Sequence, residues 1–418
     1  MKVLICAFGS YGDILPFVAI GREMQSRGHD VRFYASAIFE HQVKKAGLDI
    51  SVVNDCEDYE AAANSSDVAR PVKAWRRIAT YLEKFLRLSY RAMAADVSPE
   101  KCVVVGSTLA FSTRSLRETH HVPCATVHLY TTVLRSESQL PRFTTHKLGQ
   151  YAPRFLEPIV YSIFDNLFGD RIIGTKLNRH RSELGLSPVR RVFHKWIHST
   201  DVNIGMFPEW YAFPQSDRPA SIQLTGFPLY DGDETCALAN DVEAFLRSGS
   251  PPVAFTAGSH TAATPRFFTA SIEACQRSGR RGILLTRYAD QIPGTLPDGI
   301  ARFDYVPFRA LLPRLTAFVH HGGIGTTSLA MLAGVPQLIR PTAFDQFDNA
   351  YRATRLGVAQ ELSARRYTAS TVAASLDQLV GDKALKVRCA QLAREVERDA
   401  VTRTCDLILS ATNKPNQQ

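Results

Sequence analysis

The chain has 418 residues, a hydrophobic content of 45%, a charged content of 21% and a formal net charge of +9. One hydrophobic core rarely grows to serve a chain of this length, so two domains are expected, and the composition excludes a disordered or low-complexity protein. The positive charge favours anionic partners. Its basic residues are scattered in small groups without a nucleic-acid motif, so nucleic acid is not an expected partner.

Eight cysteines stand singly, without a C-x-x-C pair, and several fall in apolar runs where a thiol packs as a small core residue. This usage favours a reducing compartment. No run approaches the roughly eighteen apolar residues of a membrane span, and the apolar run at the N-terminus is too short for a signal peptide. The sequence therefore predicts a cytoplasmic protein, with peripheral contact at the inner face of the membrane left open.

The first half alternates predicted strands and helices. A strand at 2–8, a helix at 15–27 and a strand at 31–35 are followed by further strands at 50–53, 102–105 and 124–128. Strands that are apolar throughout are typical of a parallel sheet covered on both faces.

Two other segments, 75–93 and 158–173, mix apolar with basic or aromatic residues at helical spacing. A surface helix packed on the domain is the favoured interpretation of the first, and contact with a membrane or a lipid-like acceptor is the alternative.

Prolines and aromatic residues crowd together between Phe207 and Pro228, where we place the domain linker. The strand and helix pattern then restarts. The prediction is an α/β protein of two doubly wound Rossmann-like domains that face each other across a cleft. The predicted first domain comprises residues 1–215 and the second residues 216–384. Residues 385–418 are expected to form a long helix over 385–409 that crosses back to the first domain, followed by a disordered tail.

The most informative stretch is His320-His321-Gly322-Gly323-Ile324-Gly325-Thr326-Thr327, which joins an apolar run to a predicted helix. A helix start offers backbone N–H groups and the positive dipole end to a phosphate. One of the two histidines should face the core and the other the turn. Asp345 and Gln346, about twenty residues later, could offer acceptors to sugar hydroxyls. Phosphate at one end and a polyol at the other suggest an activated sugar.

Three weaker signals lie at predicted strand ends. Asp13, in Gly9-Ser10-Tyr11-Gly12-Asp13, could remove a proton from a hydroxyl, or it could be a helix N-cap. The turn Gly258-Ser259 could approach a phosphate, or it could be an ordinary strand turn. Tyr305 could stack on a nucleobase, or it could pack against its own domain.

Metal binding is not expected. Asp231-Gly232-Asp233 mimics the D-x-D of metal-dependent sugar transfer, but Asp-Gly is a common turn dipeptide and we interpret it as a solvated turn. No Cys or His cluster with zinc-ligand spacing stands near His320 and His321.

In combination, these segments resemble the inverting nucleotide-sugar glycosyltransferases of the B-type fold, a family that includes macrolide, glycopeptide, sterol and plant natural-product transferases. The segments that carry the resemblance are G-S-x-G-D at 9–13, T-G-F-P-L at 225–229, H-H-G-G-x-G-T-T at 320–327, A-G-V-P-Q at 333–337 and D-Q-F-D-N-A at 345–350. Nearly the whole chain is similar to the members that attach rhamnose to a lipid acceptor in rhamnolipid synthesis. The resemblance implies an acceptor-binding first domain and a nucleotide-sugar-binding second domain.

The resemblance also implies a role for each site residue. Asp13 would be the catalytic base. Plant members use a histidine supported by a carboxylate after a later strand, where this chain has Gly106-Ser107, so a single carboxylate is the consistent interpretation. No metal and no cofactor beyond the co-substrate would be needed, because a helix N-terminus and an imidazole would stabilise the leaving group. The implied donor-binding residues are Gly12, Gly258, Ser259, Tyr305, Val306, His321, Gly323, Gly325, Thr326, Asp345 and Gln346.

Plant members grip the ribose hydroxyls with a glutamate where this chain has Leu329, which suits deoxyribose and a thymidine diphosphate donor. The expected reaction is transfer of rhamnose from dTDP-rhamnose to a hydroxyl of a hydrophobic acceptor such as a 3-(3-hydroxyalkanoyloxy)alkanoate. The alternative is transfer of glucose or a deoxysugar to a sterol, polyketide or other secondary metabolite. An inactive nucleotide-binding scaffold and a nucleotide-sugar epimerase stay open as other classes, and the sequence does not settle the oligomeric state.

Overall fold

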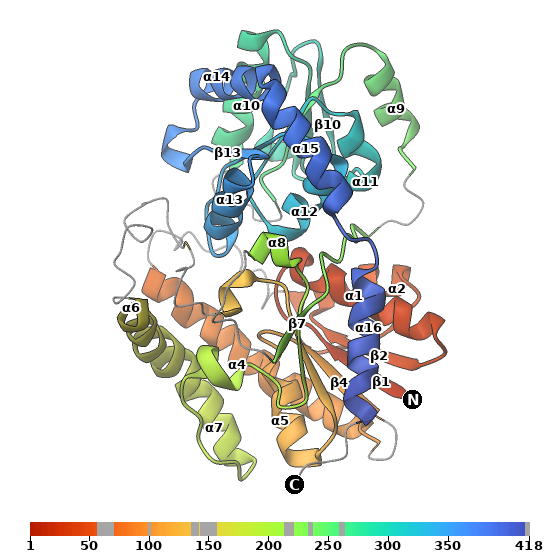
Figure 1. The fold of residues 1–418 in the computed structure, drawn as a ribbon, viewed down its shortest axis with the longest axis vertical. Coiled ribbons are helices and arrows are strands. Elements are labelled where there is room, and N and C mark those ends of the chain that lie inside the picture. The colour runs from red at the N-terminus through yellow and green to blue at the C-terminus, as the bar shows by residue number, and fades with distance from the viewer. Residues whose placement is uncertain are drawn as a thin grey trace. The chain divides into compact units, whose positions relative to one another are not determined.

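The computed structural model describes residues 1–56, 71–98, 102–134, 142, 157–212, 221–232, 237–258 and 264–413. The chain divides into two compact units, which are described separately (Figure 1). The first contains Met1–Pro141, Leu148–Pro228 and Arg398–Gln418, and the second contains Arg142–Lys147 and Leu229–Glu397.

The first unit is built on a seven-stranded sheet in the order β3-β2-β1-β4-β5-β6-β7, in which every neighbouring pair is parallel. The central strands are buried on both faces, as their continuous apolar sequences predict. The strands are β1 (Lys2–Cys6), β2 (Asp30–Ala35), β3 (Asp49–Val52), β4 (Cys102–Ser107), β5 (Cys124–His128), β6 (Val202–Gly205) and β7 (Ile222–Leu224).

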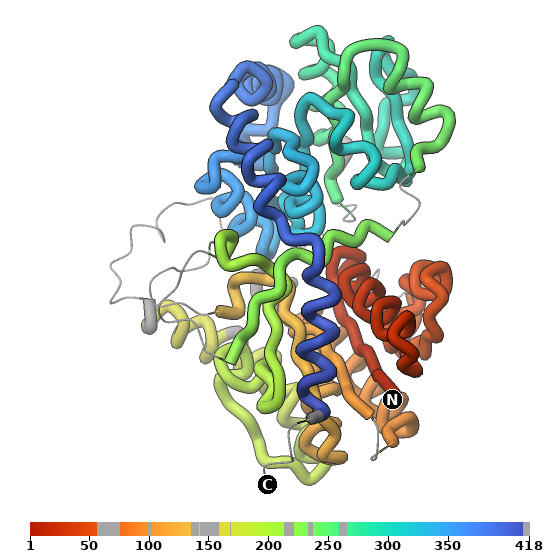
Figure 2. Tube along the Cα trace, turned by 45° about the vertical axis from the view of Figure 1, so that its right-hand side comes forward, coloured from red at the N-terminus to blue at the C-terminus, as the bar shows by residue number. Residues whose placement is uncertain are grey.

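Helices cover both faces of this sheet. Helices α4 and α5 pack with Leu4, Cys6 and Val104 in one cluster, while α1 and α16 lie side by side, the first in red and the second in blue in Figure 2. The helical elements are α1 (Tyr11–Ser26), η1 (Ala37–Phe39), α2 (Glu40–Lys45), α4 (Pro71–Asp96), α5 (Phe111–His120), η3 (Thr131–Leu134), α6 (Glu157–Phe164), the π-helical η6 (Asp165–Gly174), α7 (Thr175–Glu183), η7 (Val192–Trp196), α8 (Glu209–Ala212), α16 (Ala400–Ser410) and η11 (Ala411–Asn413).

The second unit holds a six-stranded parallel sheet in the order β10-β9-β8-β11-β12-β13. Its strands are β8 (Val253–Phe255), β9 (Gly282–Leu285), β10 (Ile300–Phe303), β11 (Ala317–His320), β12 (Gln337–Ile339) and β13 (Ala359–Glu361). Its helical elements are α9 (Asn240–Arg247), α10 (Thr264–Ser278), η8 (Ala289–Gln291), α11 (Phe308–Leu311), η9 (Leu312–Arg314), α12 (Ile324–Ala333), α13 (Gln346–Arg355), η10 (Ala364–Arg366), α14 (Ala369–Gly381) and α15 (Lys383–Glu395).

Both sheets reverse their strand order once. In the first, β2 and β3 extend to one side of β1 while β4 to β7 extend to the other, and in the second the reversal falls between β8 and β11. Ligands of such sheets bind beyond the carboxyl ends of the strands at this switch point. The prediction of two Rossmann-like α/β halves is confirmed, and the topology marks where each half would bind a ligand.

The interior of the chain departs from the sequence predictions in two places. The segment 207–228, expected to be the linker, contains α8 and the edge strand β7, so the first unit extends to Pro228 rather than to residue 215. The single helix expected over 385–409 is interrupted after Glu395 and resumes as α16 at Ala400. Only residues 398–418 belong to the first unit, while α15 belongs to the second.

Helix α16 is fixed to the rest of the first unit by polar contacts. The Thr404 and Thr225 hydroxyls lie 2.8 Å apart in a buried pair. Arg27 at the end of α1 forms an ion pair with Asp406, with an Nη1 to Oδ1 distance of 2.6 Å. These contacts attach α16 to the sheet and to α1. Of the tail expected to be disordered, residues 413–418, Asn413 ends η11, and residues 414–418 lie outside the described residues.

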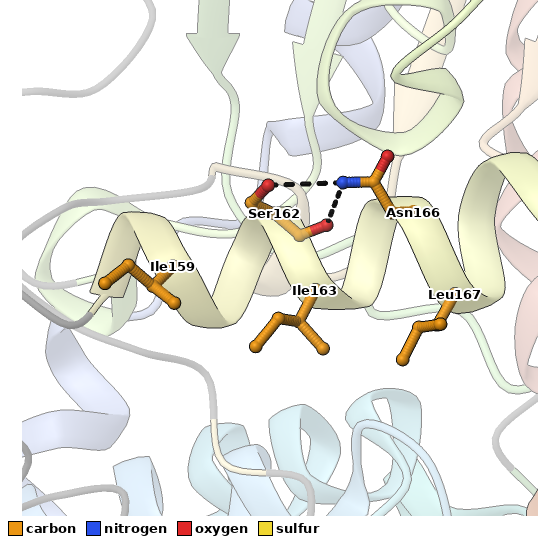
Figure 3. A pocket seen from close by; sticks show the side chains of 5 residues that line it. All are labelled: Ile159, Ser162, Ile163, Asn166 and Leu167. Atoms are coloured by element: carbon orange, nitrogen blue, oxygen red, sulfur yellow. Dashed lines mark hydrogen bonds between the residues drawn. The ribbon is translucent and has the colours of Figure 1, made fainter.

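The two candidate amphipathic segments have different environments. In α4 the apolar residues Ala79, Leu82, Phe85 and Met93 are buried in the core cluster, which matches a surface helix packed on its domain. In α6 and the start of η6, by contrast, Ile159, Ile163 and Leu167 are each about half exposed and project along one side of the helix (Figure 3). No described helix is long and apolar enough to cross a membrane.

Candidate functional site

Asp13 lies in the first turn of α1, just beyond the carboxyl end of β1. The N-cap is Ser10 and not Asp13, so the N-cap alternative for Asp13 is wrong. The carboxylate instead reaches back to Ser10: Oδ2 accepts from the Ser10 backbone N–H at 2.6 Å and from the Ser10 hydroxyl at 2.9 Å. Gly9 makes room for this arrangement, because it has φ +139° and a β-carbon there would lie 2.3 Å from Oδ2 of Asp13. Gly12 is an exposed residue of the same turn.

Burial raises the pKa of the Asp13 carboxyl from 3.8 to about 6, while the two hydrogen bonds from Ser10 oppose the rise. The group is therefore largely ionised at neutral pH, yet basic enough to accept a proton. A carboxylate with a pKa close to the working pH, held at a strand end, has the properties of a general base.

The neighbouring strand end, after β4, carries hydroxyls instead of a second carboxylate. The Ser107 hydroxyl accepts from the Phe8 N–H at 3.0 Å, which ties the ends of β1 and β4 together at the switch point. Farther along this edge, His128 contacts the Thr108 hydroxyl through Nδ1 at 3.0 Å and His198 through Nε2 at 3.1 Å. Burial holds the pKa of His128 well below its usual value, so this ring is a neutral, fully engaged part of the core.

In the second unit, the two consecutive histidines face opposite ways, as expected. His320 is fully buried and stacks on Phe318. Its Nε2 lies 3.0 Å from Oε1 of Gln337, and its Nδ1 accepts from the Gly322 N–H at 3.1 Å. Burial lowers the pKa of His320 to about 4, so it is neutral. His321 is half-buried and faces the turn.

The His321 imidazole lies between two glycines. A β-carbon on Gly258 would lie 2.6 Å from Cε1 of His321, and one on Gly323 would lie 2.6 Å from Nε2. Gly258, at φ +81°, follows β8, while His321 follows β11. These strands flank the switch point of the second sheet, so both residues lie where ligands of this topology bind. Ser259 lies outside the described residues.

Helix α12 begins beside this imidazole, with Gly323 as its N-cap. Gly325 and Thr326 lie in the first turn, whose N–H groups lack partners within the helix and can bind a phosphate. The Thr327 hydroxyl donates to the Gly323 carbonyl at 2.9 Å and steadies the turn. The helix therefore begins where the sequence predicts it, and its first turn offers N–H donors at the edge of the sheet.

The loop before α13 brings Asp345 and Gln346 to the same edge. Oε1 of Gln346 accepts from the Thr342 N–H at 2.9 Å, from the Thr342 hydroxyl at 2.9 Å and from the Ala343 N–H at 3.1 Å. This oxygen is therefore committed to shaping the loop. We expected both residues to offer acceptors to a sugar, but the Gln346 amide group retains only its NH2 donors for that purpose.

Asn349 joins the two loops, a role that sequence reasoning missed. Its Nδ2 donates to the Gly322 carbonyl at 2.9 Å and to Oδ2 of Asp345 at 2.7 Å. The glycine turn and the Asp345 carboxylate are thereby held side by side. The sequence signal was available in the D-Q-F-D-N-A segment, whose asparagine lies one helical turn after Asp345.

Arg142 was also missed, and it belongs to the second unit although it lies between segments of the first. Its backbone N–H donates to Asp348 at 3.1 Å, and its guanidinium pairs with Glu361 at 2.5 Å. Asp348 in turn pairs with Arg352 at 2.6 Å, and both side chains are buried. These contacts connect Arg142 and β13 to the first two turns of α13, directly after Gln346.

The residues expected to meet the nucleoside lie near the carboxyl end of β10. Tyr305 is 57% exposed, and its hydroxyl donates to the Asp231 carbonyl at 3.0 Å. Val306 is buried in one cluster with Leu329, so Leu329 is a core residue of α12. The Asp231 carboxylate accepts from the Arg309 N–H at 3.0 Å at the start of α11. Asp231 therefore stabilises a turn, while Asp233 lies outside the described residues.

No three His, Cys, Asp or Glu side chains of the described residues are grouped so that they could hold a metal ion. The seven cysteines within the same residues are free thiols, and all but Cys56 are buried.

Two family models match this chain. The glycosyltransferase family 28 N-terminal domain matches residues 3–134, and the C-terminal domain of erythromycin biosynthesis protein CIII-like proteins matches residues 283–403. The first match includes Asp13, and the second includes every donor-side residue from Tyr305 onward. Along its sequence the chain is 26% identical to O-mycaminosyltylonolide 6-deoxyallosyltransferase of Streptomyces fradiae, over 98% of this chain and 97% of that protein.

Solved structures with the same fold cover nearly the whole chain. The glycosyltransferase of kitacinnamycin matches with a TM-score of 0.76 and 19% identity, over 98% of this chain and 99% of that one. A spinosyn rhamnosyltransferase complexed with thymidine diphosphate matches with a TM-score of 0.68 and 17% identity, over 97% of this chain and 100% of that one. These similarities extend over both units.

Proposed function

We propose that this chain, a nucleotide-sugar glycosyltransferase of the B-type fold that matches the family 28 N-terminal and EryCIII-like C-terminal domain models, transfers a deoxysugar to a hydroxyl of a hydrophobic small molecule. The donor is a thymidine diphosphate sugar, and rhamnose is the first candidate for its sugar. Transfer proceeds with inversion at the anomeric carbon.

Asp13 is the catalytic base of this proposal, and its environment is the observation that carries it. Its carboxylate is fixed by two hydrogen bonds from Ser10, and its pKa is raised to about 6. It takes the proton of the acceptor hydroxyl as the oxygen attacks the anomeric carbon. The bond from that carbon to the diphosphate oxygen breaks, and the nucleoside diphosphate leaves with the electron pair.

The donor half of the proposal uses the edge of the second sheet. The first turn of α12 and the His321 imidazole bind the diphosphate and stabilise its charge as it leaves. Asp345 accepts hydrogen bonds from sugar hydroxyls, while the NH2 of Gln346 donates to a sugar oxygen. Tyr305 and the Val306 backbone contact the base, and Gly258 allows close approach to the donor. Gly12 and Ser259 are further donor-binding residues of the proposal, on the resemblance alone.

Two observations support a thymidine donor. Leu329 is a buried apolar residue, so no carboxylate stands at that position to hold a ribose 2′-hydroxyl. A structural relative is described as a rhamnosyltransferase complexed with thymidine diphosphate, and a sequence relative is described as a 6-deoxyallosyltransferase. Rhamnose and 6-deoxyallose, the sugars in these two names, are both 6-deoxyhexoses.

For the acceptor, the relatives favour the secondary-metabolite alternative over the rhamnolipid reaction, because the Streptomyces fradiae relative is named for O-mycaminosyltylonolide and the structural relative is named for spinosyn. A lipid-like hydroxy acid stays as the second candidate on one observation. Ile159, Ile163 and Leu167 expose aliphatic surface on the first unit, and the polar groups beside them, Ser162 and Asn166, hydrogen-bond to each other (Figure 3). Such a surface suits a hydrocarbon chain more than a polyhydroxylated ligand.

Mass spectrometry of reaction products tests the proposal. The enzyme is mixed with dTDP-rhamnose, dTDP-glucose, UDP-glucose or UDP-rhamnose, and with either a panel of macrolide and aromatic aglycones or 3-(3-hydroxyalkanoyloxy)alkanoates. We expect a product that is heavier by one deoxyhexose and that requires a thymidine donor. A preference for uridine donors would refute the donor assignment, and product from the hydroxyalkanoyloxy acid alone would select the lipid candidate. Absence of sugar transfer to every acceptor, with no donor binding by calorimetry, would refute the proposed function.

A further inference from the structure

Arg340 lies at the carboxyl edge of the second sheet, directly after β12. Its backbone N–H donates to the His320 carbonyl at 2.8 Å. The strand register pairs His320 with Ile339, so the residues that follow, His321 and Arg340, are neighbours across the two strands. Residues paired in this way point to the same face of a parallel sheet. Arg340 therefore lies beside His321, next to the switch point between β8 and β11.

The Arg340 guanidinium lies against a stacked pair of aromatic rings. Its guanidinium carbon lies 5.6 Å from the ring centre of Phe267 and 5.3 Å from that of Tyr367. These rings stack on each other at 4.9 Å, and both are buried. The Tyr367 hydroxyl lies 2.8 Å from the Ser271 hydroxyl, which fixes the second ring. The guanidinium is thus held in one position by groups that form no ion pair with it.

This cation has no anionic partner within the part of the chain that the structure describes. Its Nε is buried without a hydrogen-bond partner. Burial lowers the pKa of Arg340, opposed only by the Tyr367 hydroxyl, and no carboxylate contributes. Removing a charge from water without a counter-ion is costly, and contact with aromatic rings offsets only part of that cost. A fixed, partly desolvated guanidinium is well suited to a bound anion, because little water has to be displaced and little side-chain entropy is lost.

We propose that Arg340 is a phosphate-binding residue that contacts the diphosphate of the donor from the side of His321. The inference rests on the proposed function and deepens it, since it adds a permanent positive charge to a site otherwise made of backbone N–H groups and an imidazole. Arg340 then stabilises the charge that develops on the leaving diphosphate. Its contribution depends on the phosphates and not on the nucleoside.

Calorimetric titration of the full-length protein tests the assignment, with thymidine diphosphate and thymidine as probes. Arg340→Met keeps an apolar side chain against Phe267 and Tyr367 but removes the charge. We expect it to weaken thymidine diphosphate binding by about ten- to a hundredfold, the usual effect of losing a hydrogen bond to a charged group, and to leave thymidine binding unchanged. Arg340→Lys keeps the charge without the planar fork and should show a smaller loss.

The matched control is Arg365→Met, which removes the same charge from an exposed position of η10 in the same unit. It should leave both affinities within about twofold of the wild type, because exposed charges are screened by solvent. If Arg340→Met is folded and binds thymidine diphosphate as the wild type does, Arg340 has only a packing role and the inference is wrong. Should Arg340→Met fail to fold, Arg340→Gln is judged by the same criterion. Failure of the wild type to bind any nucleoside diphosphate would instead refute the proposed function.

Discussion

Gly258 and His321 lie so close together that no other residue fits at position 258 without moving the imidazole. A β-carbon on Gly258 would lie 2.6 Å from Cε1 of His321 and 2.7 Å from its Nδ1. The two residues come from strands on either side of the switch point of the second sheet. The position of the imidazole is therefore set by a glycine more than sixty residues away in the sequence.

Gly258→Ala should weaken donor binding by displacing His321. The matched control is Gly279→Ala, because Gly279 also has a positive φ, +62°, but a β-carbon there would meet nothing within 4 Å. Both substitutions incur the backbone strain of a left-handed alanine, about 1–2 kcal/mol. Thermal denaturation should show similar losses of stability, while calorimetry with thymidine diphosphate should show weaker binding only for Gly258→Ala. Equal affinities for the two variants would mean that His321 does not contact the diphosphate.

Asn349→Ala should damage the site and the fold together. The Asn349 side chain is 3% exposed, and its amide joins Gly322 to Asp345. Without it, the Gly322 carbonyl and the Asp345 carboxylate each lose a hydrogen-bond donor. We expect a loss of about 1–3 kcal/mol in the free energy of unfolding, measured by denaturant titration, and a higher KM for the donor. Asn166→Ala serves as the control, because exposed Asn166 bonds only within its own helical turn, to Ser162. A donor KM unchanged in Asn349→Ala would contradict the view that this amide aligns the sugar loop.

The pH dependence of transfer should follow Asp13. A base with a pKa of about 6 is protonated below that pH, so kcat/KM should fall about tenfold for each pH unit below 6. The stability of the fold should change with pH in the opposite direction to the activity. The pKa of Asp13 is higher in the folded than in the unfolded protein, so between about pH 4 and pH 6 the carboxyl is protonated in the folded state and ionised in the unfolded state. The free energy of unfolding of the wild type, relative to Asp13→Asn, should therefore decrease as the pH rises through that window.

Ser10→Ala should move the acidic limb of this profile to higher pH. The Ser10 hydroxyl donates to the ionised Asp13 carboxylate at 2.9 Å, and its loss disfavours the charged form. Ser26→Ala is the control, because Ser26 lies at the other end of α1 and its hydroxyl bonds only the Glu23 carbonyl. A profile of Ser10→Ala that coincides with the wild type would show that the titrating group is not Asp13.

Much of the architecture could be predicted because its signals are local. Continuous apolar runs identified the central strands, such as Cys124–His128, to within a residue or two. Glycine turns followed by helices placed Asp13 and His321 at strand ends, and parallel topology then brought each to a switch point. That one of His320 and His321 faces the core and the other the turn followed from the alternation of side chains along a strand.

What the sequence could not show depends on contacts between distant residues. The strand Ile222–Leu224 has only three residues and is defined by pairing with β6, so it was mistaken for linker. The break between α15 and α16 has no proline or glycine to mark it. The Gln346 oxygen was expected to face a sugar, but three donors of its own loop occupy it. The role of Arg340 could not be predicted, because the aromatic rings that hold its guanidinium, Phe267 and Tyr367, come from α10 and from the segment before α14.

The most direct measurement is single-turnover sugar transfer by Asp13→Asn, with thymidine diphosphate affinity measured by calorimetry on the same preparation. Asparagine can keep an acceptor toward Ser10, so the turn should remain folded, but it cannot take a proton. We expect transfer to slow by about a hundred- to ten-thousandfold, the usual contribution of a general base, while donor affinity is unchanged. Transfer within about threefold of the wild-type rate, with the donor still bound, would contradict the assignment of Asp13 as the catalytic base.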